Sequence, residues 1–471
     1  MIALTLAEIA DALGGRIERG EPENVIDGSI ETDSRLVSAG SVFFALPGET
    51  TDGALFAPAA VEAGAALVIA ERELALSASE GAAALIVVPD GVAALADLAR
   101  LVVARVRALG RLRVVAITGS NGKTTTKNLL RAVLTGEGPT VAPEGSFNNH
   151  VGAPISMLRV DESTEYLVVE MGASKIGEIA RLISIVTPDI GIVLKVGLAH
   201  AGEFGGIDAV QRAKAEMVTE LPADAVALLH GDDPRVDEMA GMTRARVVRF
   251  GVGEANDLRA DDVEAVRSGT TFDYLADGAR HPVALRILGE HHVTNALAAL
   301  GAARELGIPA VRAIAAIETV PRAERWRMQV LEPGDGVTVI NDAYNASPDS
   351  TAAALKTLAQ ITRGGAGRSI AVLGEMAELG EYAQEEHDRI GRLVVRLNIG
   401  QLVVVGERAR HIHAAAGLEG SWDGESVFVA DAEAAYDLLR GELRAGDVVL
   451  VKSSKSAGLR FLGDRLGGVS A

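Results

Sequence analysis

The chain contains no cysteine among its 471 residues. This absence excludes disulfide bonds, thiolate nucleophiles, and zinc or iron–sulfur centres held by cysteine. Positive charge is also scarce, because 45 Lys and Arg stand against 64 Asp and Glu, a formal net charge of −19. General nucleic-acid binding relies on an excess of Lys and Arg, so the charge balance argues against it. Any anion that the protein binds must be held by a few locally placed cations and backbone amides.

Long hydrophobic runs are missing as well. No stretch approaches 18 uninterrupted apolar residues, and residues 1–15 are typical of an amphipathic helix with acidic residues, not of a signal peptide. We therefore expect a cytoplasmic protein without membrane insertion. The sequence shows no internal repeat and no low-complexity tract. With 48% hydrophobic and 23% charged residues, the chain can bury large cores, and its length suggests about three domains.

Short apolar runs alternate with helical patterns along the whole chain, which predicts an α/β fold. We expect domains at residues 1–108, 109–326 and 327–471. The second has the rhythm of a parallel sheet and becomes richer in β-structure after Arg246, and the third has the outline of a doubly wound sheet, whose ligands bind at the carboxyl ends of the strands. The expected strands are 42–46, 66–70, 85–88, 114–118, 166–170, 190–196, 225–230, 247–251, 283–288, 337–341, 370–373, 402–405, 427–429 and 448–452. The clearest expected helices are 56–63, 92–109 and 293–306.

The most informative stretch is 114–127, VVAITGSNGKTTTK. A β-branched apolar run ends in a turn with two glycines, and Lys123 and Thr124 open a helical pattern. Glycines let the backbone approach an anion closely, and free N–H groups at a helix start point at it. Lys123 can reach the β- and γ-phosphates of a nucleotide, and the Thr124 hydroxyl can hold Mg²⁺. The strict P-loop pattern needs glycine where Ile117 stands, so this phosphate loop is a variant.

Polar side chains follow the neighbouring strands. Glu170 ends the strand after the loop, where a carboxylate can serve Mg²⁺; without that loop it would equally suit a helix cap or a surface acid. His200 follows the third strand and could be a second metal ligand, although a lone histidine is usually structural. Lys214 lies in a helical stretch, and composition alone assigns it to the solvated surface.

Further polar stretches follow later strands. The stretch 146–149, SFNN, has paired amides that suit sugar or phosphate oxygens, but asparagine also favours turns, and on its own the turn interpretation prevails. In the third segment, 341–348, 374–380 and 452–455 are each polar stretches at strand ends. Any one could be an ordinary capping loop. Together they indicate a single ligand-binding rim.

These motifs together resemble those of the Mur ligase family, ATP-dependent enzymes that form amide bonds in peptidoglycan precursors. The resemblance covers essentially the full length and is strongest to the MurF type. The motifs that carry it are TGSNGKT (118–124), TDSR (32–35), GSVFFALPG (40–48), DG (52–53), SFNN (146–149), EMGA (170–173), NDAYNA (341–346) and VLGEMAELG (372–380). The last two motifs are the most specific for the MurF type, and the order and spacing of the whole set argue against chance agreement.

The resemblance implies a three-domain architecture: a UDP-sugar-binding N-terminal domain, a central P-loop-type ATPase domain, and a C-terminal Rossmann-like domain that binds the incoming dipeptide and closes on ATP. It implies that UDP-N-acetylmuramoyl-tripeptide and D-alanyl-D-alanine are joined through an acyl phosphate, with ATP and Mg²⁺ as cofactors, by a monomer. A carboxylate must be activated in this way because the oxide ion that an amine would otherwise have to displace from it is too poor a leaving group. Acyl phosphates hydrolyse, so such a site must close against water.

The resemblance also implies residue roles. The expected catalytic residues are Lys123 on the ATP phosphates, Glu170 and His200 as Mg²⁺ ligands, and Lys214. Lys214 matches the family's carbamylated lysine, which reverses the surface interpretation because a carbamate can bind Mg²⁺ where an ammonium group cannot. Thr124 is expected to share one Mg²⁺ with Glu170. Other expected nucleotide contacts are Gly119, Ser120, Asn121, Gly122, Thr125, Asn295, Arg327 and Asp342. Expected substrate contacts are Asp33, Ser34, Arg35, Asn148, Asn149 and Asn345.

Several positions depart from the family pattern. Asparagine is usual where the chain has Lys195, His230, His292 and Ser347. Histidine, glycine and arginine are frequent where it has Ala54, Ser453 and Lys455. The departures concern base and substrate contacts, and the phosphate, Mg²⁺ and carbamate positions are intact.

Two alternatives remain. Another ligase of the family could add diaminopimelate, lysine or glutamate, but the motifs at 341–346 and 374–380 argue against this, and the diaminopimelate-associated Asp-Asn-Pro-Arg is absent. A non-catalytic nucleotide-binding switch is the other alternative. Glu170, His200 and Lys214 speak against it, because a pure switch needs no second metal site.

Overall fold

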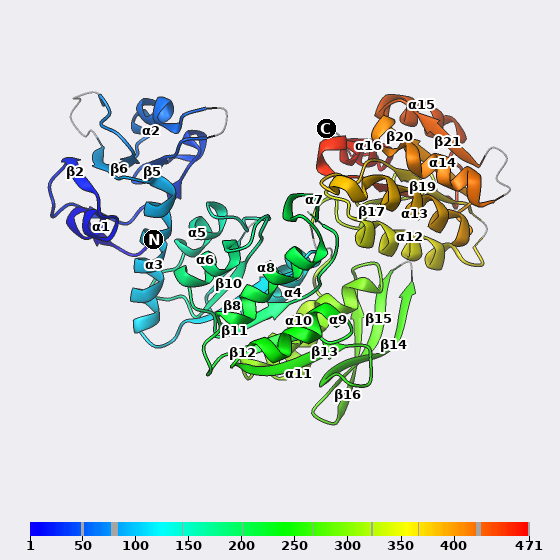
Figure 1. Cartoon of the computed structure of the whole chain (residues 1–471), viewed down its shortest axis with the longest axis horizontal. Helices are drawn as coiled ribbons and strands as arrows, with labels where there is room; N and C mark the ends of the chain where they lie inside the picture. The colour runs from blue at the N-terminus through cyan, green and yellow to red at the C-terminus, as the bar shows by residue number, and fades with distance from the viewer. Residues whose placement is uncertain are drawn as a thin grey trace.

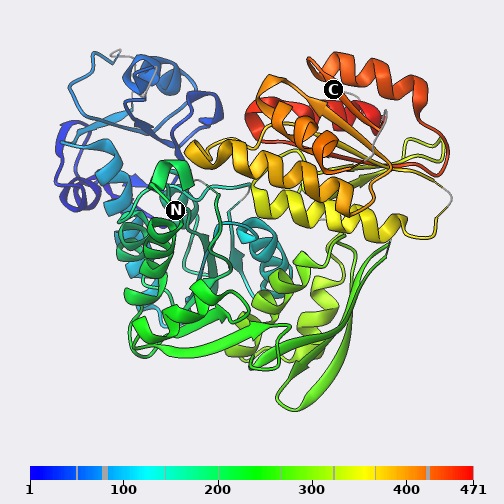
Figure 2. The same ribbon diagram turned by 45° about the vertical axis from the view of Figure 1, so that its right-hand side comes forward.

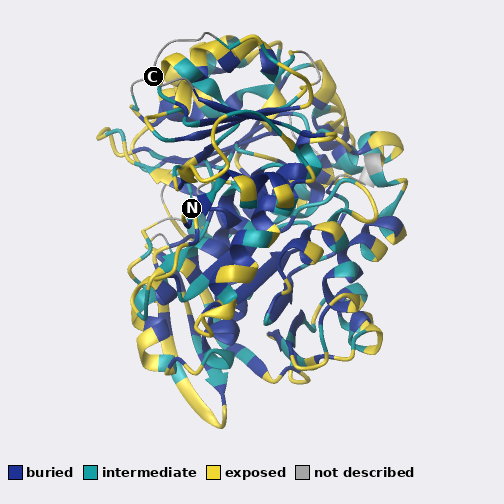
Figure 3. Ribbon diagram, turned by 90° about the vertical axis from the view of Figure 1, so that its left-hand side faces the viewer, coloured by how far each residue is buried: buried dark blue, intermediate teal, exposed yellow. Residues whose placement is uncertain are grey.

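The computed structural model describes residues 1–48, 51–76, 83–143, 145–199, 201–266, 268–321, 324–365, 367–420 and 425–469. These residues build three α/β units in chain order. The first and the third flank the upper side of the second in the view of Figure 1. The strands are largely buried between helices, while exposed residues gather on outer helix faces and in loops (Figure 3). No helix of these residues is both long and apolar enough to cross a bilayer.

The first unit is a five-stranded sheet in the order β2-β7-β6-β5-β4, parallel except for β2. Its strands are β2 (Arg16–Arg19), β4 (Ile30–Glu31), β5 (Val42–Ala45), β6 (Leu67–Ala70) and β7 (Ala84–Val87), with a separate antiparallel pair, β1 (Leu4–Thr5) and β3 (Val25–Ile26). Helices α1 (Leu6–Ala12) and α2 (Ala57–Glu62) cover it. The helix expected over 1–15 begins only at Leu6, because Thr5 and Glu8 cap each other's backbone.

Helix α3 (Gly91–Ala108) joins the first unit to the second. Asp90 caps it, and its apolar face packs against α1 on one side and against α5 (Gly152–Met157) and α6 (Glu178–Ile185) on the other. One continuous hydrophobic core therefore runs through both units. Ion pairs reinforce the junction, from Arg105 to Glu8 at 2.8 Å and from Arg107 to Asp189 at 2.7 Å.

The second unit is a nine-stranded sheet in the order β16-β15-β14-β13-β12-β11-β8-β10-β9, with β8 to β13 parallel around the phosphate loop. Its strands are β8 (Arg113–Thr118), β9 (Thr140–Val141), β10 (Tyr166–Glu170), β11 (Ile190–Val193), β12 (Val226–His230), β13 (Arg246–Gly251), β14 (Leu258–Val266), β15 (Gly269–Ala276) and β16 (Ala279–Leu285). Helices α4 (Lys123–Thr135), α10 (His291–Glu305) and α11 (Ala310–Ile317) share a core with one face. Helices α3, α5, α6 and α8 (Ile207–Thr219) share a core with the other.

Strands β14 and β15 were not among the expected strands. They form an antiparallel extension that carries Asp261, Asp262 and Glu264, and a register shift interrupts their pairing. Because these charged residues lie on a half-exposed ribbon, the sequence lacks the regular apolar alternation that would have identified the two strands. The strand expected over 190–196 ends at Val193, where the chain leaves the sheet to meet the phosphate loop.

The third unit is a six-stranded sheet in the order β17-β18-β22-β19-β20-β21, parallel except for β17. Its strands are β17 (Gln329–Leu331), β18 (Thr338–Asn341), β19 (Ser369–Leu373), β20 (Gln401–Val405), β21 (Ser426–Val429) and β22 (Val448–Lys452). Helices α12 (Pro348–Thr362), α13 (Ala383–Arg396) and α14 (Arg410–Glu419) cover one face, and α15 (Ala432–Glu442) and α16 (Leu459–Leu466) the other. This confirms the doubly wound prediction. Figure 2 shows α12, in yellow, next to the second unit.

The junction between the second and third units is conformationally unusual. Trp326 and Met328 have left-handed φ values of 64° and 47° on either side of Arg327. Such values are costly for large side chains and persist only where contacts hold them. The Trp326 indole donates to Asp464 of α16 at 2.8 Å, and the Met328 N–H donates to Asp342 at 2.9 Å. The third unit therefore holds the junction in a defined conformation.

The shared core at α3 yields a stability prediction. Leu98→Ala removes a fully buried side chain from the core that joins the first two units, so we expect a loss of about 2–5 kcal/mol in unfolding free energy. Leu109→Ala makes the same chemical change at the exposed end of this helix and should change it by less than about 0.5 kcal/mol. Urea unfolding followed by circular dichroism measures both, and equal losses would contradict the shared-core interpretation.

Candidate functional site

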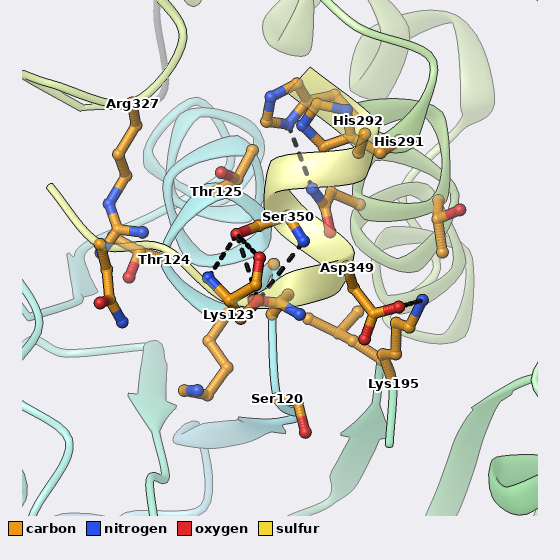
Figure 4. A pocket seen from close by; sticks show the side chains of 18 of the residues that line it. Ser120, Lys123, Thr124, Thr125, Lys195, His291, His292, Arg327, Asp349 and Ser350 are labelled. Carbon is orange, nitrogen blue, oxygen red and sulfur yellow. Dashed lines mark hydrogen bonds and ion pairs between the residues drawn. The ribbon is translucent and has the colours of Figure 1, made fainter. Parts of the chain in front are cut away.

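A cavity of about 320 Å³ lies between the second and third units, at the carboxyl ends of their strands (Figure 4). Both units contribute to its wall, so the site spans the junction at residues 326–328. The expected residues in this wall are Ser120, Asn121, Gly122, Lys123, Thr124, Thr125, Asn148, Glu170, Asn295, Arg327, Asp342 and Asn345. The structure thus brings together residues from four separate sequence motifs, and adds Asn295 and Arg327 to them.

The phosphate loop needs glycine at two points. Gly122 has φ 88° and precedes α4, and a Cβ on it would lie 2.2 Å from Asn295 Oδ1. Gly119 has φ 147°, and a Cβ there would lie 2.9 Å from the Leu194 Cβ. Ile117 is fully buried in β8, on the face that packs against α4 and α10. The variant loop therefore begins its turn after the strand, and the position occupied by isoleucine belongs to the core.

Lys123 folds back over this loop. Its ammonium group donates to Gly119 O at 2.6 Å, and burial lowers its pKa. A cation held over the start of a helix is suited to bind phosphate oxygens, because the helix amides and the ammonium group attract the same anion.

Thr124 and Glu170, which are expected to share one Mg²⁺, lie in direct contact. The Thr124 hydroxyl donates to Glu170 Oε2 at 3.1 Å, and the Asn148 amide donates to Glu170 Oε1 at 2.8 Å. Glu170 is only 1% exposed. A hydroxyl and a carboxylate are oxygen ligands of the kind Mg²⁺ prefers, so this pair fits the expected cation. The described part of the chain contains no cluster of three His, Asp or Glu side chains suited to a metal, and His200 lies outside the described residues.

Lys214 is buried, so the interpretation from composition was wrong. It lies in α8 at 3% exposure, with the Phe204 ring 5.8 Å from its ammonium nitrogen. Burial, and then the nearby charge of Lys123, lower its pKa to about 7. Helical periodicity gave no sign of this, because the groups that bury Lys214 come from other parts of the sequence. An amine with a pKa of about 7 is about half neutral at pH 7, and the neutral form can react with CO₂, which agrees with the carbamate that the resemblance implies.

The third unit supplies a cation and a carboxylate. Arg327 donates to Ser146 Oγ at 3.2 Å, and its guanidinium carbon lies 4.2 Å from the centre of the Tyr344 ring. The carboxylate of Asp342 accepts from Lys452 at 2.6 Å as well as from the Met328 backbone. Lys452 also donates to the backbone of Asn345, so it orders the loop after β18.

Sequence reasoning missed the role of Ser146. The motif at 146–149 drew attention to its two asparagines, yet the Ser146 hydroxyl lies between Arg327, at 3.2 Å, and the Thr124 hydroxyl, at 3.3 Å. It thereby connects the third unit to the expected Mg²⁺ pair. Asn149 instead accepts from the Gly152 backbone at 2.8 Å, as the turn interpretation expects. Its substrate role stays a prediction.

Four buried polar atoms in the wall of the cavity have no hydrogen-bond partner among the residues that the structure describes. They are Asn121 Nδ2, His291 Nδ1, His292 Nε2 and Arg327 Nε. Buried polar groups are normally paired, so four such atoms around one cavity indicate a polar ligand. The two histidine rings lie 4.0 Å apart, and burial lowers the pKa of His291 to about 4 and that of His292 well below its ordinary value. Both rings are therefore neutral near pH 7 and can accept or donate a hydrogen bond.

The expected UDP-sugar residues lie elsewhere, in the first unit. Ser34 and Arg35 begin a short 3₁₀ turn, and Asp33 caps it. Arg35 donates to Asp33 at 2.9 Å, and these hydrogen bonds hold the pKa of the Asp33 carboxyl at about 2. These residues do not line the cavity between the second and third units. Their substrate roles stay predictions.

Comparison with known proteins identifies the class. Three Mur ligase descriptions match this chain: the family's catalytic domain at residues 28–103, its middle domain at 117–303, and its glutamate ligase domain at 326–455. The chain belongs to the Mur ligase family.

Within that family the chain is similar to MurF ligases. It is 44% identical to the UDP-N-acetylmuramoyl-tripeptide–D-alanyl-D-alanine ligase of Mycobacterium tuberculosis, over 99% of this chain and 98% of the relative. A crystal structure of MurF from Acinetobacter baumannii superposes with a TM-score of 0.87 at 30% identity, over 99% of both chains. MurF ligase from Thermotoga maritima in complex with ADP superposes with a TM-score of 0.80 at 28% identity, over 94% of this chain and 97% of that one. The resemblance stated from the sequence is confirmed.

The lowered pKa of Lys214 predicts a carbamate that can be observed directly. With ¹³C-labelled bicarbonate, ¹³C NMR should show a carbamate signal that grows from pH 6 to pH 8, because the neutral fraction of an amine with pKa about 7 rises from about one tenth to about nine tenths. Lys214→Ala should lose the signal, and Lys356→Ala, which removes an exposed helical lysine, should keep it. An unchanged signal in Lys214→Ala would rule out the assignment.

Proposed function

We propose that the chain joins D-alanyl-D-alanine to UDP-N-acetylmuramoyl-tripeptide in an ATP-dependent ligation of peptidoglycan precursor synthesis. The observation that carries the proposal is the single cavity in which Lys123, Thr124 and Glu170 face Arg327 and Asp342 across the junction of two units. The names of the relatives supply the two substrates. No other amino-acid acceptor is favoured by a contact in the described residues.

The reaction begins with activation of a carboxylate. An oxygen of the terminal tripeptide carboxylate attacks the γ-phosphorus of ATP, and ADP leaves with the bonding electrons. Lys123 and the amides at the start of α4 hold the phosphates, and Arg327 adds positive charge from the opposite wall. Two Mg²⁺ ions would neutralise phosphate charge when bound. Thr124 and Glu170 would hold one, His200 would be a ligand of the second, and a carbamylated Lys214 would be a further ligand.

The second step forms the amide. The amine nitrogen of D-alanyl-D-alanine attacks the acyl carbon, the tetrahedral intermediate loses a proton, and inorganic phosphate leaves. Because an acyl phosphate is also open to attack by water, the third unit has to cover the site during this step. Its contacts across the cavity, from Arg327 to Ser146 and from Ser347 to Asn121, provide such a cover.

Domain limits and cellular setting belong to the same proposal. The first domain ends at residue 108, the last residue of α3, and the third begins at Arg327, within the junction. Residues 1–108 bind the UDP-sugar through Ser34 and Arg35, and Asn148, Asn149 and Asn345 contact the peptide substrates. We further propose a monomer acting in the cytoplasm, because one chain supplies both walls of the cavity and ATP is a cytoplasmic substrate.

The activity has a direct test. The purified chain should release phosphate from ATP only when UDP-N-acetylmuramoyl-tripeptide and D-alanyl-D-alanine are both present, with lysine- and diaminopimelate-containing tripeptides compared in parallel. Glu170→Gln should abolish release, because it removes the buried carboxylate that faces Thr124. Release with single amino acids in place of the dipeptide would contradict the proposal.

A second prediction concerns the metal ligands. Lys214→Ala should lower kcat by more than the roughly 10- to 100-fold typical of losing an outer-shell partner, because a ligand itself is lost. Small carboxylates such as acetate should restore part of the activity by occupying the vacated place. Full activity without any additive would show that no carbamate is needed.

A further inference from the structure

The amino end of α12 contacts the phosphate loop from the opposite unit. Ser347, its cap residue, donates to Asn121 Oδ1 at 3.2 Å, and Asp349 in its first turn pairs with Lys195 at 3.3 Å. A carboxylate is favoured in the first turn of a helix. The third unit thus places a negative charge at the edge of a cavity whose expected ligand is also negative.

Lys195 is fixed to the phosphate loop through its backbone. Its carbonyl oxygen accepts from the Ser120 N–H at 2.8 Å, and a Cβ on Gly119 would lie 3.1 Å from its backbone nitrogen. Its side chain lines the same cavity as Lys123. Figure 4 shows Lys195 joined to Asp349 on the side of the cavity where Ser120 lies. The cavity therefore contains a second lysine anchored to the loop.

The ion pair is poorly suited to a purely structural role. The Lys195 side chain is 40% exposed and that of Asp349 35%, and ion pairs at such exposure add little stability. The Asp349 carboxylate is also pressed against the backbone after β11, since a Cβ on Gly197 would lie 2.4 Å from its Oδ2. Asp349 has a short side chain on the first turn of α12, whereas the long side chain of Lys195 can turn between Asp349 and a ligand.

We propose that Lys195 is a second phosphate-binding lysine, which Asp349 holds beside the loop until the nucleotide arrives. Before ATP or ADP binds, the ammonium group of Lys195 screens the charge of Asp349. When the nucleotide binds, this group leaves the carboxylate and contacts phosphate oxygens instead. An uncharged asparagine at this position could neither screen the carboxylate nor attract the phosphate. The inference rests on the proposed function for the identity of the nucleotide.

The test is ADP binding to the full-length chain with Mg²⁺, measured by titration calorimetry without peptide substrates. Lys195→Asn should weaken ADP binding about three- to tenfold, as expected for the loss of one charge-assisted contact, and Lys195→Arg should stay within about twofold of the unsubstituted chain. Asp349→Asn should tighten binding about two- to fivefold, because it removes both the competitor and the repulsion. The salt dependence of binding should be shallower for Lys195→Asn.

The control is Gln360→Ala, which removes a 2.7 Å contact with Glu290 between the same two units and outside the cavity. This substitution should leave the ADP affinity within about twofold of that of the unsubstituted chain, since it removes a contact between the two units and no contact with phosphate. Unchanged binding in Lys195→Asn would overturn the proposal, as would equal weakening in Asp349→Asn or in Gln360→Ala, because either result would reduce the pair to an interface contact.

Failure of the Lys195 proposal can be distinguished from failure of the proposed function. In the phosphate-release assay, Lys195→Asn should raise the KM for ATP about three- to tenfold with kcat changed by less than about twofold. If release proved independent of D-alanyl-D-alanine, the ligase assignment would fail while the ADP measurements still decided the role of Lys195. Absence of ADP binding by the unsubstituted chain would overturn both.

Discussion

The contact between Thr124 and Glu170 depends on the register of two parallel strands. Glu170 pairs with Ile117 across β10 and β8, so its carboxylate lies beside the loop that follows β8. A shift of one residue would turn the Glu170 side chain to the other face of the sheet. Valine and isoleucine side chains packed on both faces fix this register. The geometry of the phosphate site is therefore a consequence of core packing.

The third unit completes the site through polar contacts that cross the cavity. Arg327 reaches Ser146, Ser347 reaches Asn121, and Asp349 reaches Lys195, each at 3.2–3.3 Å. By contrast, the first unit shares a hydrophobic core with the second through α3. Apolar cores resist relative motion, whereas a few polar contacts can break and form again. The molecule thus combines one junction built on a shared apolar core with one that depends on polar contacts and on Leu288 and Leu198 packed against the core of the third unit.

Features encoded within one motif could be predicted from the sequence. The phosphate loop and the strand ends at Glu170 and Asp342 are local signals, because β-branched runs and glycines define them. Features set by packing could not. The burial of Lys214 depends on neighbours from other segments, and Ser146 meets Arg327 across 181 residues of sequence. Strand β14 was hidden for a related reason, since its charged residues are stable only as part of an exposed ribbon paired with β15.

The junction around Arg327 gives Asp342 two tasks at once. Its carboxylate holds the Met328 N–H, and with it a left-handed backbone position, while the same carboxylate lines the nucleotide cavity. An ionised carboxylate can accept several hydrogen bonds, so Asp342 can hold this N–H and face the cavity at the same time. Loss of the carboxylate would remove the contact that holds a backbone conformation costing about 1–3 kcal/mol. One side chain therefore ties the conformation of the linker to the wall of the cavity, and a substitution at Asp342 would change both.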